Sequence, residues 1–501
     1  MTQQNATDVT PAVFTARPLR VAIIGAGPAG IYAADILTKS ERDFELAIDI
    51  FDRYPAPYGL IRYGVAPDHP RIKGIVKALH KVLDRGDIRF FGNVNYGVDL
   101  TLAELNEHYD AVIFATGAIT DADLNIPGIE LDGSYGAADF VSWYDGHPDV
   151  PRTWPLEAKE IAVLGNGNVA LDVARVLSKH AEDLLVTEIP ENVFAGLKDS
   201  PVTDVHVFGR RGPAQVKFTP LELRELSHSQ DVDIVLYPED FEFDAASDAA
   251  IKSNNQIKTM VGTLTNWLIE QEEREENADV AQSSEPAVAG RPRRRLHLHF
   301  LQSPIEVTGQ NGKVTGLTFE RQKLDGTGQA RGTGEQVHYP VQAIYRAIGY
   351  FGSALPEIEY DGRTGIVPNH EGKVLDRSGS HVPGLYATGW IKRGPVGLIG
   401  HTKSDAAETI AHLISDLSTL PLATHADPEA VSALLVTKSV AYTSWEGWLA
   451  LDAHEQALGA AAEPAPTKAG PVPRERIKVV DRAEMLAASA TAQEASASLA
   501  G

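Results

Sequence analysis

Two short glycine-rich turns constrain the fold of this 501-residue chain more than any other feature. The first, GAGPAG at residues 25–30, follows the apolar run RVAII and precedes a helical pattern of apolar residues. The second, GNGNVA at residues 165–170, follows EIAVL and precedes another helical pattern. Strand, glycine turn and helix form the βαβ unit that binds dinucleotides. We therefore predict an α/β fold with two Rossmann-like dinucleotide-binding domains.

In the first turn, each glycine has its own physical task. Gly25 permits the tight turn, Gly27 lets the backbone approach a pyrophosphate, and Gly30 lets helix and strand pack closely. The next strand, FELAIDIFD, ends at Asp52, an acid placed to accept hydrogen bonds from ribose hydroxyls. We assign Gly25, Gly27, Ala29, Gly30 and Asp52 to a first nucleotide site.

The second unit ends its strand differently. The stretch HVFGRRG at residues 206–212 carries Arg210 and Arg211 where the first unit has an acid. A guanidinium fork binds a 2′-phosphate, whereas an acid would repel it, so the first site is predicted to take an unphosphorylated ribose and the second NADP. The alternative is a solvated arginine pair. Arg210 comes later than the usual separation of about 20 residues from the glycine turn, so an excursion must precede its strand.

Composition excludes several function classes. The formal net charge of −23 argues against nucleic acid as a partner, because phosphate binding needs a basic surface. The chain has no cysteine, which excludes thiol redox chemistry and Fe-S ligation by its own residues, so redox work requires a bound cofactor. No apolar run reaches the length of about 20 residues that a membrane helix needs, and a cytoplasmic location is expected.

Several longer motifs point to one family. FATGA (114–118) and RAIGY (346–350) look like the crossovers between two nucleotide domains, and GLYATGWIKRGPVGLIG (384–400) looks like a segment that closes over a flavin. Together with PYGLIRYGVAPDHP (57–70), GRRGPAQVKFTPLELREL (209–226) and TSWEGWLALDAHE (443–455), the chain resembles the adrenodoxin reductase type of ferredoxin-NADP reductase. This type belongs to the glutathione-reductase-like flavoproteins, most of which have Asp where this chain has Trp390; His401 also departs, because the family usually has Thr there.

The resemblance implies an NADP domain inserted in an FAD domain, with FAD and NADP(H) as cofactors. The expected boundaries are 17–119 and 350–458 for the FAD domain, 120–349 for the NADP domain and 459–501 for a partly flexible C-terminal extension. The implied activity is hydride transfer from NADPH to FAD and then single-electron transfer to a ferredoxin, reversible in principle.

The resemblance also implies roles for single residues. Asp52 would hold the FAD ribose, and the other FAD contacts would come from Leu60, Tyr96, Gly397, Leu398 and Ile399. The pyrophosphate of NADP would lie against Asn166, Gly167, Asn168 and Val169. Glu222 and Trp390 would lie near the nicotinamide, and His69 would pair with Glu222 as a proton-handling or orienting pair. The alternative for this pair is a structural hydrogen bond, and for Trp390 a space-filling aromatic.

An acidic ferredoxin would need a basic docking surface. One helical pattern over residues 69–86 places Lys73, Lys77, Lys81 and Arg85 on a basic face, which is our first candidate. The stretch RPRRR (291–295) is the second. His297 and His299 alternate along a predicted strand and are interpreted as strand surface, because no third metal ligand is evident, so we predict no metal site.

Two other functions stay open. An NADPH-dependent flavin oxidase or quinone reductase needs no protein thiols and would have the same two domains. A flavin redox sensor is the non-enzymatic alternative and would show slow flavin reduction and a long-lived reduced state.

Overall fold

The computed structural model describes residues 12–229, 231–278, 291–396 and 399–499. Its first unit is built on a seven-stranded sheet in the order β16-β17-β18-β4-β1-β2-β3. The strands are β1 (Leu19–Ile24), β2 (Leu46–Asp52), β3 (Ile88–Gly92), β4 (Ala111–Phe114), β16 (Asn369–His370), β17 (Lys373–Leu375) and β18 (His381–Ala387). Strands β18, β4, β1, β2 and β3 are parallel, and β16 and β17 add an antiparallel edge. Six buried residues in a row make β1 a central strand, as its apolar sequence predicts.

The second unit is built on a six-stranded parallel sheet in the order β6-β14-β7-β8-β10-β9. The strands are β6 (Ser134–Gly136), β7 (Glu160–Leu164), β8 (Asp204–Phe208), β9 (Val232–Val235), β10 (Arg294–His299) and β14 (Ala343–Arg346). A three-stranded antiparallel sheet of β11 (Gln302–Gln310), β12 (Lys313–Leu324) and β13 (Ala330–Tyr339) packs against it.

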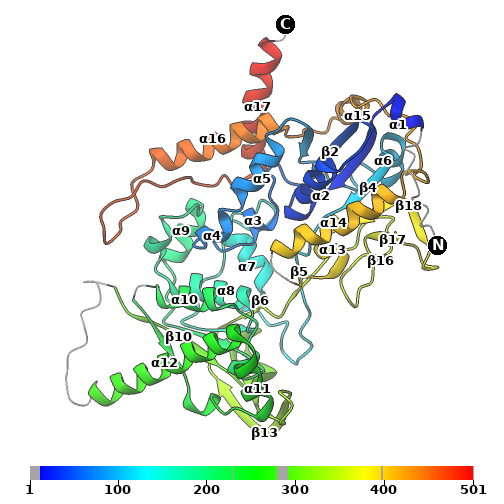
Figure 1. Cartoon of the computed structure of the whole chain (residues 1–501). Coiled ribbons are helices and arrows are strands. Elements are labelled where there is room, and N and C mark those ends of the chain that lie inside the picture. Colours follow the sequence, from blue (N-terminus) through cyan, green and yellow to red (C-terminus); the bar gives the residue numbers. More distant parts are fainter. Residues whose placement is uncertain (1–11, 230, 279–290, 397–398, 500–501) are drawn as a thin grey trace, which may run out of the picture.

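The second unit lies between β4 and β16 in the chain, so it is inserted in the first. A two-stranded antiparallel ribbon joins them, formed by β5 (Thr120–Asp121) on the way out and β15 (Tyr350–Phe351) on the way back. The predicted fold class, two Rossmann-like domains with one inserted in the other, is confirmed. Figure 1 shows the two units as separate bodies, with the second below the first.

Helices cover the sheets of both units. In the first unit, α2 (Pro28–Lys39) and α14 (Ile399–Ser415) lie side by side on the sheet (Figure 1). The others there are α1 (Ala12–Ala16), α3 (Leu60–Tyr63), α4 (Pro70–Lys73), α5 (Val76–Leu83), α6 (Leu102–His108), α13 (Trp390–Arg393) and α15 (Ala430–Thr437). The second unit carries α7 (Ala137–Tyr144), α8 (Asn168–Ser178), α9 (Glu191–Lys198), α10 (Pro220–Ser227), α11 (Ala245–Ser253) and α12 (Asn255–Ala278).

The excursion predicted before the arginine strand is present. Between α8 and β8 the chain forms a 3-10 turn (Ala181–Leu184) and helix α9, and Val193 and Leu197 of α9 pack into the core of the second unit. Strand β8 nevertheless pairs with β7, with Glu160 opposite Asp204 and Leu164 opposite Phe208. The added residues therefore leave the βαβ arrangement intact.

The chain ends in α16 (Trp445–Ala461) and α17 (Arg482–Leu499), joined by an extended segment. Residues 474–479 of this segment include buried side chains and pack against both units. Among the described helices, none is long and apolar enough to cross a membrane.

Candidate functional site

The first glycine turn has the shape that its three glycines predict. Gly25 has a φ of +114°, and a Cβ there would lie 2.5 Å from the carbonyl oxygen of Ala115. A Cβ on Gly30 would lie 2.0 Å from the carbonyl oxygen of Gly25, so only glycine lets α2 approach the turn. At Gly27, by contrast, a Cβ would meet only the Cα of Gly59, at 3.8 Å. A side chain would therefore clash with the protein at Gly25 and Gly30, but not at Gly27.

Gly27 lies at the N-terminus of α2, and a ligand can bind at this end of the helix. Gly27 is the N-cap and supplies no side-chain cap to the first N–H groups of this 12-residue helix. Free N–H groups and the helix dipole favour a phosphate at such an end. The residues present thus fit a dinucleotide pyrophosphate.

Asp52 lies against this turn. Its carboxylate accepts hydrogen bonds from the backbone N–H of Ala26 at 2.8 Å and of Tyr54 at 3.0 Å. Burial raises the pKa of Asp52, although the two backbone N–H groups act to lower it. Each carboxylate oxygen has a second lone pair, so the group can still accept hydrogen bonds from a ribose.

The structure places the other residues predicted to contact FAD in different parts of the first unit. Leu60 begins α3 directly after Gly59, whose Cα lies beside Gly27, so Leu60 is close to the glycine turn. Tyr96 is buried, and its hydroxyl donates to the carbonyl of Pro356 at 2.7 Å. Gly397 and Leu398 lie outside the described residues, and Ile399 begins α14.

The second glycine turn repeats the pattern of the first. Gly165 has a φ of +142°, and a Cβ there would lie 2.2 Å from the carbonyl oxygen of Ala347. Gly167 is the N-cap of α8, and a Cβ there would have no described atom within 4 Å. Ala170 takes the third position and is fully buried. The two flanking asparagines are engaged, because the Asn168 side chain accepts from the N–H of Thr219 at 3.0 Å and the Asn166 carbonyl accepts from the N–H of Lys217 at 3.0 Å.

Arg210 and Arg211 follow β8 next to this turn. The Cβ that a side chain at Gly209 would have lies 3.2 Å from the Cβ of Asn166, which fixes the end of β8 beside the turn. Arg210 is exposed and Arg211 partly exposed. Within the described residues, neither guanidinium has a hydrogen bond or ion pair with a protein group. Two unpaired guanidinium groups beside an open glycine turn fit a 2′-phosphate.

His69 and Glu222 meet between the two units. His69 Nε2 lies 2.8 Å from Glu222 Oε1, and His69 Nδ1 lies 3.3 Å from Glu225 Oε1. Both residues of the predicted pair are buried, with 2% and 5% of their surface exposed. Burial would lower the pKa of His69, but the two carboxylates outweigh it and raise this pKa above its ordinary value. The pair therefore favours the imidazolium.

A buried arginine that sequence reasoning gave no role supports this pair. Arg175 of α8 makes two hydrogen bonds to Asp68, at 2.8 and 2.9 Å, and one to Asp172 at 2.8 Å. Its Nη1 lies 3.9 Å from the carboxylates of Glu222 and Glu225. Burial raises the pKa of Asp172 to about 7, against the opposing effect of Arg175. Arg175 ends the stretch GNGNVALDVAR (165–175), which begins with the second glycine turn, so this stretch was the available signal.

Trp390 lies where the chain returns from the second unit. It begins α13, and its ring lies 6.5 Å from that of Tyr350, the first residue of β15. The preceding Gly389 has a φ of +74°, and a Cβ there would lie 2.6 Å from the Cβ of Ala29. Asp405 of α14 accepts from the Gly389 N–H at 2.5 Å, a role that sequence reasoning missed. Trp390 is thus tied to the first glycine turn through its neighbour.

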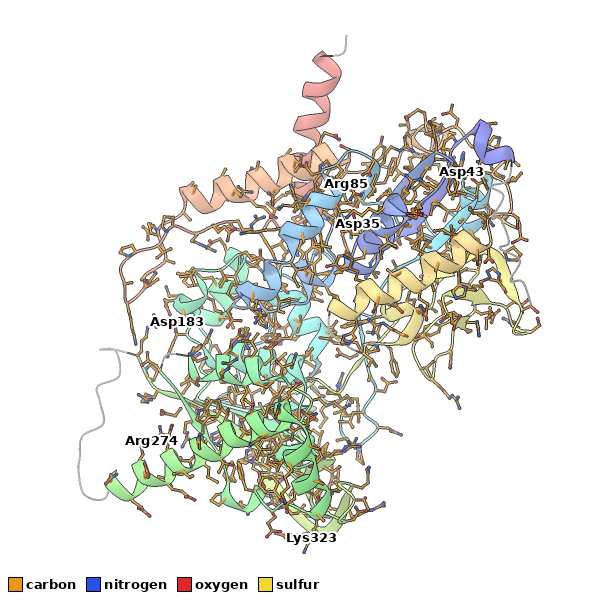
Figure 2. The ribbon with its side chains drawn as sticks, viewed as in Figure 1. Asp35, Asp43, Arg85, Asp183, Arg274 and Lys323 are labelled. Atoms are coloured by element: carbon orange, nitrogen blue, oxygen red, sulfur yellow. The ribbon has the colours of Figure 1, made fainter. Side chains whose placement is uncertain are left out.

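The predicted basic docking face is wrong in part. The helical pattern breaks between α4 and α5, and Lys73 at the end of α4 turns inward, 3.0 Å from Asp145 and 2.9 Å from Glu188. Arg85 pairs with Asp35 at 2.5 Å, and Figure 2 labels both. Lys77 and Lys81 are exposed.

The structure does not support the second docking candidate, residues 291–295, because its arginines are bound to protein groups. Arg291 pairs with Asp183 at 2.9 Å, and Arg295 pairs with Asp204 at 2.6 Å. Arg293 pairs with Asp233. Arg294 is buried and donates to the carbonyl of Lys179 at 2.6 Å. These guanidinium groups serve the fold.

The interpretation of His297 and His299 as strand surface is wrong. Both are buried, with 7% and 2% of their surface exposed, and a third histidine, His206 of β8, lies beside them. His206 Nδ1 is 3.0 Å from His299 Nε2, while His297 is 2.8 Å from both Asp204 and the hydroxyl of Tyr237. These hydrogen bonds occupy nitrogen atoms that a metal ion would need.

Comparisons with known proteins agree on one family. The family model described as pyridine nucleotide-disulphide oxidoreductase matches residues 19–206. The chain is 38% identical to NADPH-ferredoxin reductase FprA of Mycobacterium tuberculosis, over 94% of this chain and 99% of the relative. It is 36% identical to the mitochondrial NADPH:adrenodoxin oxidoreductase of Arabidopsis thaliana, over 89% and 92%. The solved structure of Mycobacterium tuberculosis FprA in complex with NADPH superposes with a TM-score of 0.81 and 36% identity, covering 95% of this chain and 100% of that one.

Proposed function

Because the chain belongs to the family of NADPH-ferredoxin reductases of the adrenodoxin reductase type, we propose that it is an FAD-dependent NADPH:ferredoxin oxidoreductase. The observation that carries this is the contrast between its two glycine turns: one ends beside a carboxylate, Asp52, and the other beside Arg210 and Arg211, whose guanidinium groups have no protein partner in the described part of the chain. Such a pair of sites selects two different dinucleotides, FAD and NADPH.

We assign the first turn to FAD. Gly25 and Gly30 shape the turn, Gly27 and the start of α2 take the pyrophosphate, and Asp52 takes the ribose. Leu60 and Tyr96, together with Gly397, Leu398 and Ile399, complete the proposed FAD contacts. NADPH delivers two electrons as a hydride whereas an iron-sulfur protein accepts one, and FAD supplies the conversion between them when bound.

We assign the second turn to NADPH. Gly167 and the N-terminus of α8 take the pyrophosphate, with Asn166, Asn168 and Val169 around it. Arg210 and Arg211 bind the 2′-phosphate and so favour NADPH over NADH. The division at residues 17–119, 120–349, 350–458 and 459–501 is proposed with these sites, since each sheet draws its strands from the matching ranges.

His69, Glu222 and Trp390 are proposed to act where the two nucleotides meet. Glu222 orients the His69 ring through the 2.8 Å contact to Nε2 and holds a proton on it. Arg175 in turn fixes the carboxylates around His69, since it is bound to Asp68 and Asp172. Trp390 orients the nicotinamide by aromatic contact. Hydride transfer itself requires placement of the two rings more than it requires a base.

A comparison of NADPH with NADH tests the second site. In the holoprotein, Arg210→Ala with Arg211→Ala should lower the affinity for NADPH by about 100-fold, on the order of 3 kcal/mol for two charge-assisted contacts, and leave that for NADH unchanged. Lys217→Ala is the matched control, because it removes an exposed cation near the same turn. An equal loss with both cofactors would refute 2′-phosphate recognition.

For ferredoxin docking we propose a smaller surface than the sequence predicted, formed by Lys77 and Lys81. Both are exposed on α5, and an acidic partner needs such a local basic patch on an acidic chain. Lys77→Glu with Lys81→Glu should raise the KM for ferredoxin and leave reduction by NADPH unchanged. Lys258→Glu on α12 is the control, and an unchanged KM in the double variant would exclude this surface. A cytoplasmic location stays a proposal.

A further inference from the structure

The segment of residues 474–482, which we name the strap, crosses between the two units. It is the last part of the connection from α16 to α17, ending at Arg482, the first residue of α17, and it contains the buried side chains of Arg474 and Lys478, with 4% and 3% of their surface exposed. Two buried cations need partners, because an unpaired buried charge is costly. Their partners therefore indicate what the strap does.

Lys478 binds both units at once. Its ammonium donates to the carbonyl of Arg62 in the first unit at 2.7 Å and to the carbonyl of Asp145 in the second at 3.0 Å. It also lies 2.7 Å from the carboxylate of Glu188, again in the second unit. Lys73 of the first unit pairs with the same two acids, Asp145 and Glu188. The two lysines and two acids thus form a buried, charge-balanced cluster between the units.

Lys478 and Glu188 of this cluster are both charged at neutral pH. Burial lowers the pKa of Lys478 to about 8, and the carboxylate of Glu188 limits the decrease. Lys73 and Lys478 together attract Glu188, and its pKa lies well below the ordinary value despite burial. Lys73 and Lys478 are therefore each paired with the Glu188 carboxylate near pH 7, while burial raises the pKa of Asp145 against the attraction of the same two lysines.

The strap is also held at both ends and along its length. Arg474 pairs with Glu191 at 2.5 Å and donates to the carbonyl of Ile189 in the second unit. At the other end, Arg482 donates to the carbonyl of Arg53 in the first unit and pairs with Asp149 in the second.

The strap packs against helix α16. A Cβ on Gly459 would lie 2.6 Å from the Cα of Arg476, so glycine permits the close approach. The N–H groups of Ile477 and Val479 donate to Glu455, at its carbonyl and its carboxylate. The same carboxylate is bound by Arg62 at 2.5 and 3.0 Å. Helix α16, against which the strap packs, is thus bound to the first unit.

We propose that the strap is a positioning element that fixes the two nucleotide-binding units relative to each other, with Lys478 as its central residue. The inference rests on the proposed function, because hydride transfer needs the two reacting atoms within about 3.5 Å. The backbone link between the units is the ribbon of β5 and β15, whose strands have two residues each. Asp68 and His69 of the first unit also contact residues of the second unit, but these contacts belong to the proposed reaction site. Among the described residues, the polar partners of Lys478 are Arg62, Asp145 and Glu188, and none of these is assigned to nucleotide binding.

The test compares Lys478→Met with Lys468→Met in the FAD-loaded protein. Lys468 lies in the same C-terminal extension, is exposed and carries the same charge, so it is the matched control. We expect Lys478→Met to retain FAD and to bind NADP⁺ within threefold of the unaltered protein. The rate of flavin reduction at saturating NADPH should fall at least tenfold, while reduction by dithionite, which needs no nicotinamide placement, stays unchanged.

Amide hydrogen exchange gives a second, independent readout. The N–H groups of Ile119 and Ala122 bond across the ribbon to the carbonyls of Phe351 and Gly349. Their exchange should be faster in Lys478→Met and unchanged in Lys468→Met. If the unaltered protein is not reduced by NADPH, the proposed function fails, but the exchange comparison still tests the strap.

Two results would overturn the proposal. One is a full reduction rate and unchanged ribbon exchange in Lys478→Met, with only a lower melting temperature, which would make the cluster merely stabilising. If Lys478→Met does not retain FAD, Arg474→Met replaces it, since this change releases one end of the strap from the second unit. An unchanged rate and unchanged exchange in a folded Arg474→Met would equally refute positioning.

Discussion

The substitution Gly167→Ala should weaken the binding of NADP⁺ and leave the fold intact. Gly167 has a φ of −105°, which any residue adopts, and a Cβ there would have no described atom within 4 Å. The added methyl group is thus tolerated by the protein. The remaining cost is the poorer N-cap of α8, roughly 0.5–1 kcal/mol in the free energy of unfolding.

The same methyl group would occupy the space through which we expect the pyrophosphate to approach. A phosphate oxygen bonded to backbone N–H groups lies about 2.9 Å from the nitrogen atoms, so a methyl group at this point displaces it. Loss of one charge-assisted hydrogen bond costs about 1.5–3 kcal/mol, equivalent to about a 10- to 150-fold weaker Kd.

Isothermal titration of NADP⁺ into the FAD-loaded variant measures this loss. Gly262→Ala is the matched control, because its Cβ also meets no described atom within 4 Å and it lies in α12, away from the glycine turn. FAD content and melting temperature should stay near those of the unaltered protein. A Kd for NADP⁺ within twofold of the unaltered value would refute the assignment of this turn to the pyrophosphate.

Three further outcomes follow from the same geometry. Gly30→Ala places a Cβ 2.0 Å from the carbonyl oxygen of Gly25, so the purified variant should lose most of its FAD, measured as flavin absorbance per protein; full occupancy would contradict the packing role. Glu222→Gln removes a carboxylate that raises the pKa of His69, so an NMR titration of that imidazole should give a lower pKa; an unchanged value would exclude the pairing. Burial lowers the pKa of His297 to about 4, so the unfolded chain binds more protons between about pH 6.5 and 4, and stability falls as pH falls through this range, by at most about 3 kcal/mol from this group. Urea unfolding at pH 7 and pH 5 should show a smaller decrease for His297→Gln, and an equal decrease would place the acid sensitivity elsewhere.

The local parts of the fold could be predicted from the sequence. Strand, glycine turn and helix are neighbours in the chain, so GAGPAG and GNGNVA define both βαβ units without any long-range information. The excursion before β8 was also required by spacing alone. The insertion of one unit in the other rested on the family resemblance of FATGA and RAIGY, because composition does not reveal which strands join which sheet.

The errors arose where distant segments decide burial. Lys73 was predicted to be exposed because its own helix has a polar face there, but its ammonium is bound by Asp145, Glu188 and the carbonyl of Arg62. His297 and His299 share a strand face, yet their third neighbour, His206, comes from a strand about 90 residues earlier in the chain. The C-terminal extension at 459–501, which was expected to be partly flexible, gave no sign that Arg474 and Lys478 of the strap would be buried.

The central claim is that electrons pass from NADPH through bound FAD to a ferredoxin. Anaerobic stopped-flow reduction of the holoprotein by NADPH and by NADH, followed by mixing with oxidised ferredoxin and a cytochrome reporter, tests it directly. We predict fast reduction with a strong preference for NADPH, then rapid cytochrome reduction that requires ferredoxin. Fast reduction followed by reoxidation by oxygen or quinone, with ferredoxin ignored, would contradict the account and favour a flavin oxidase or quinone reductase. Slow reduction and a long-lived reduced state would instead favour a redox sensor.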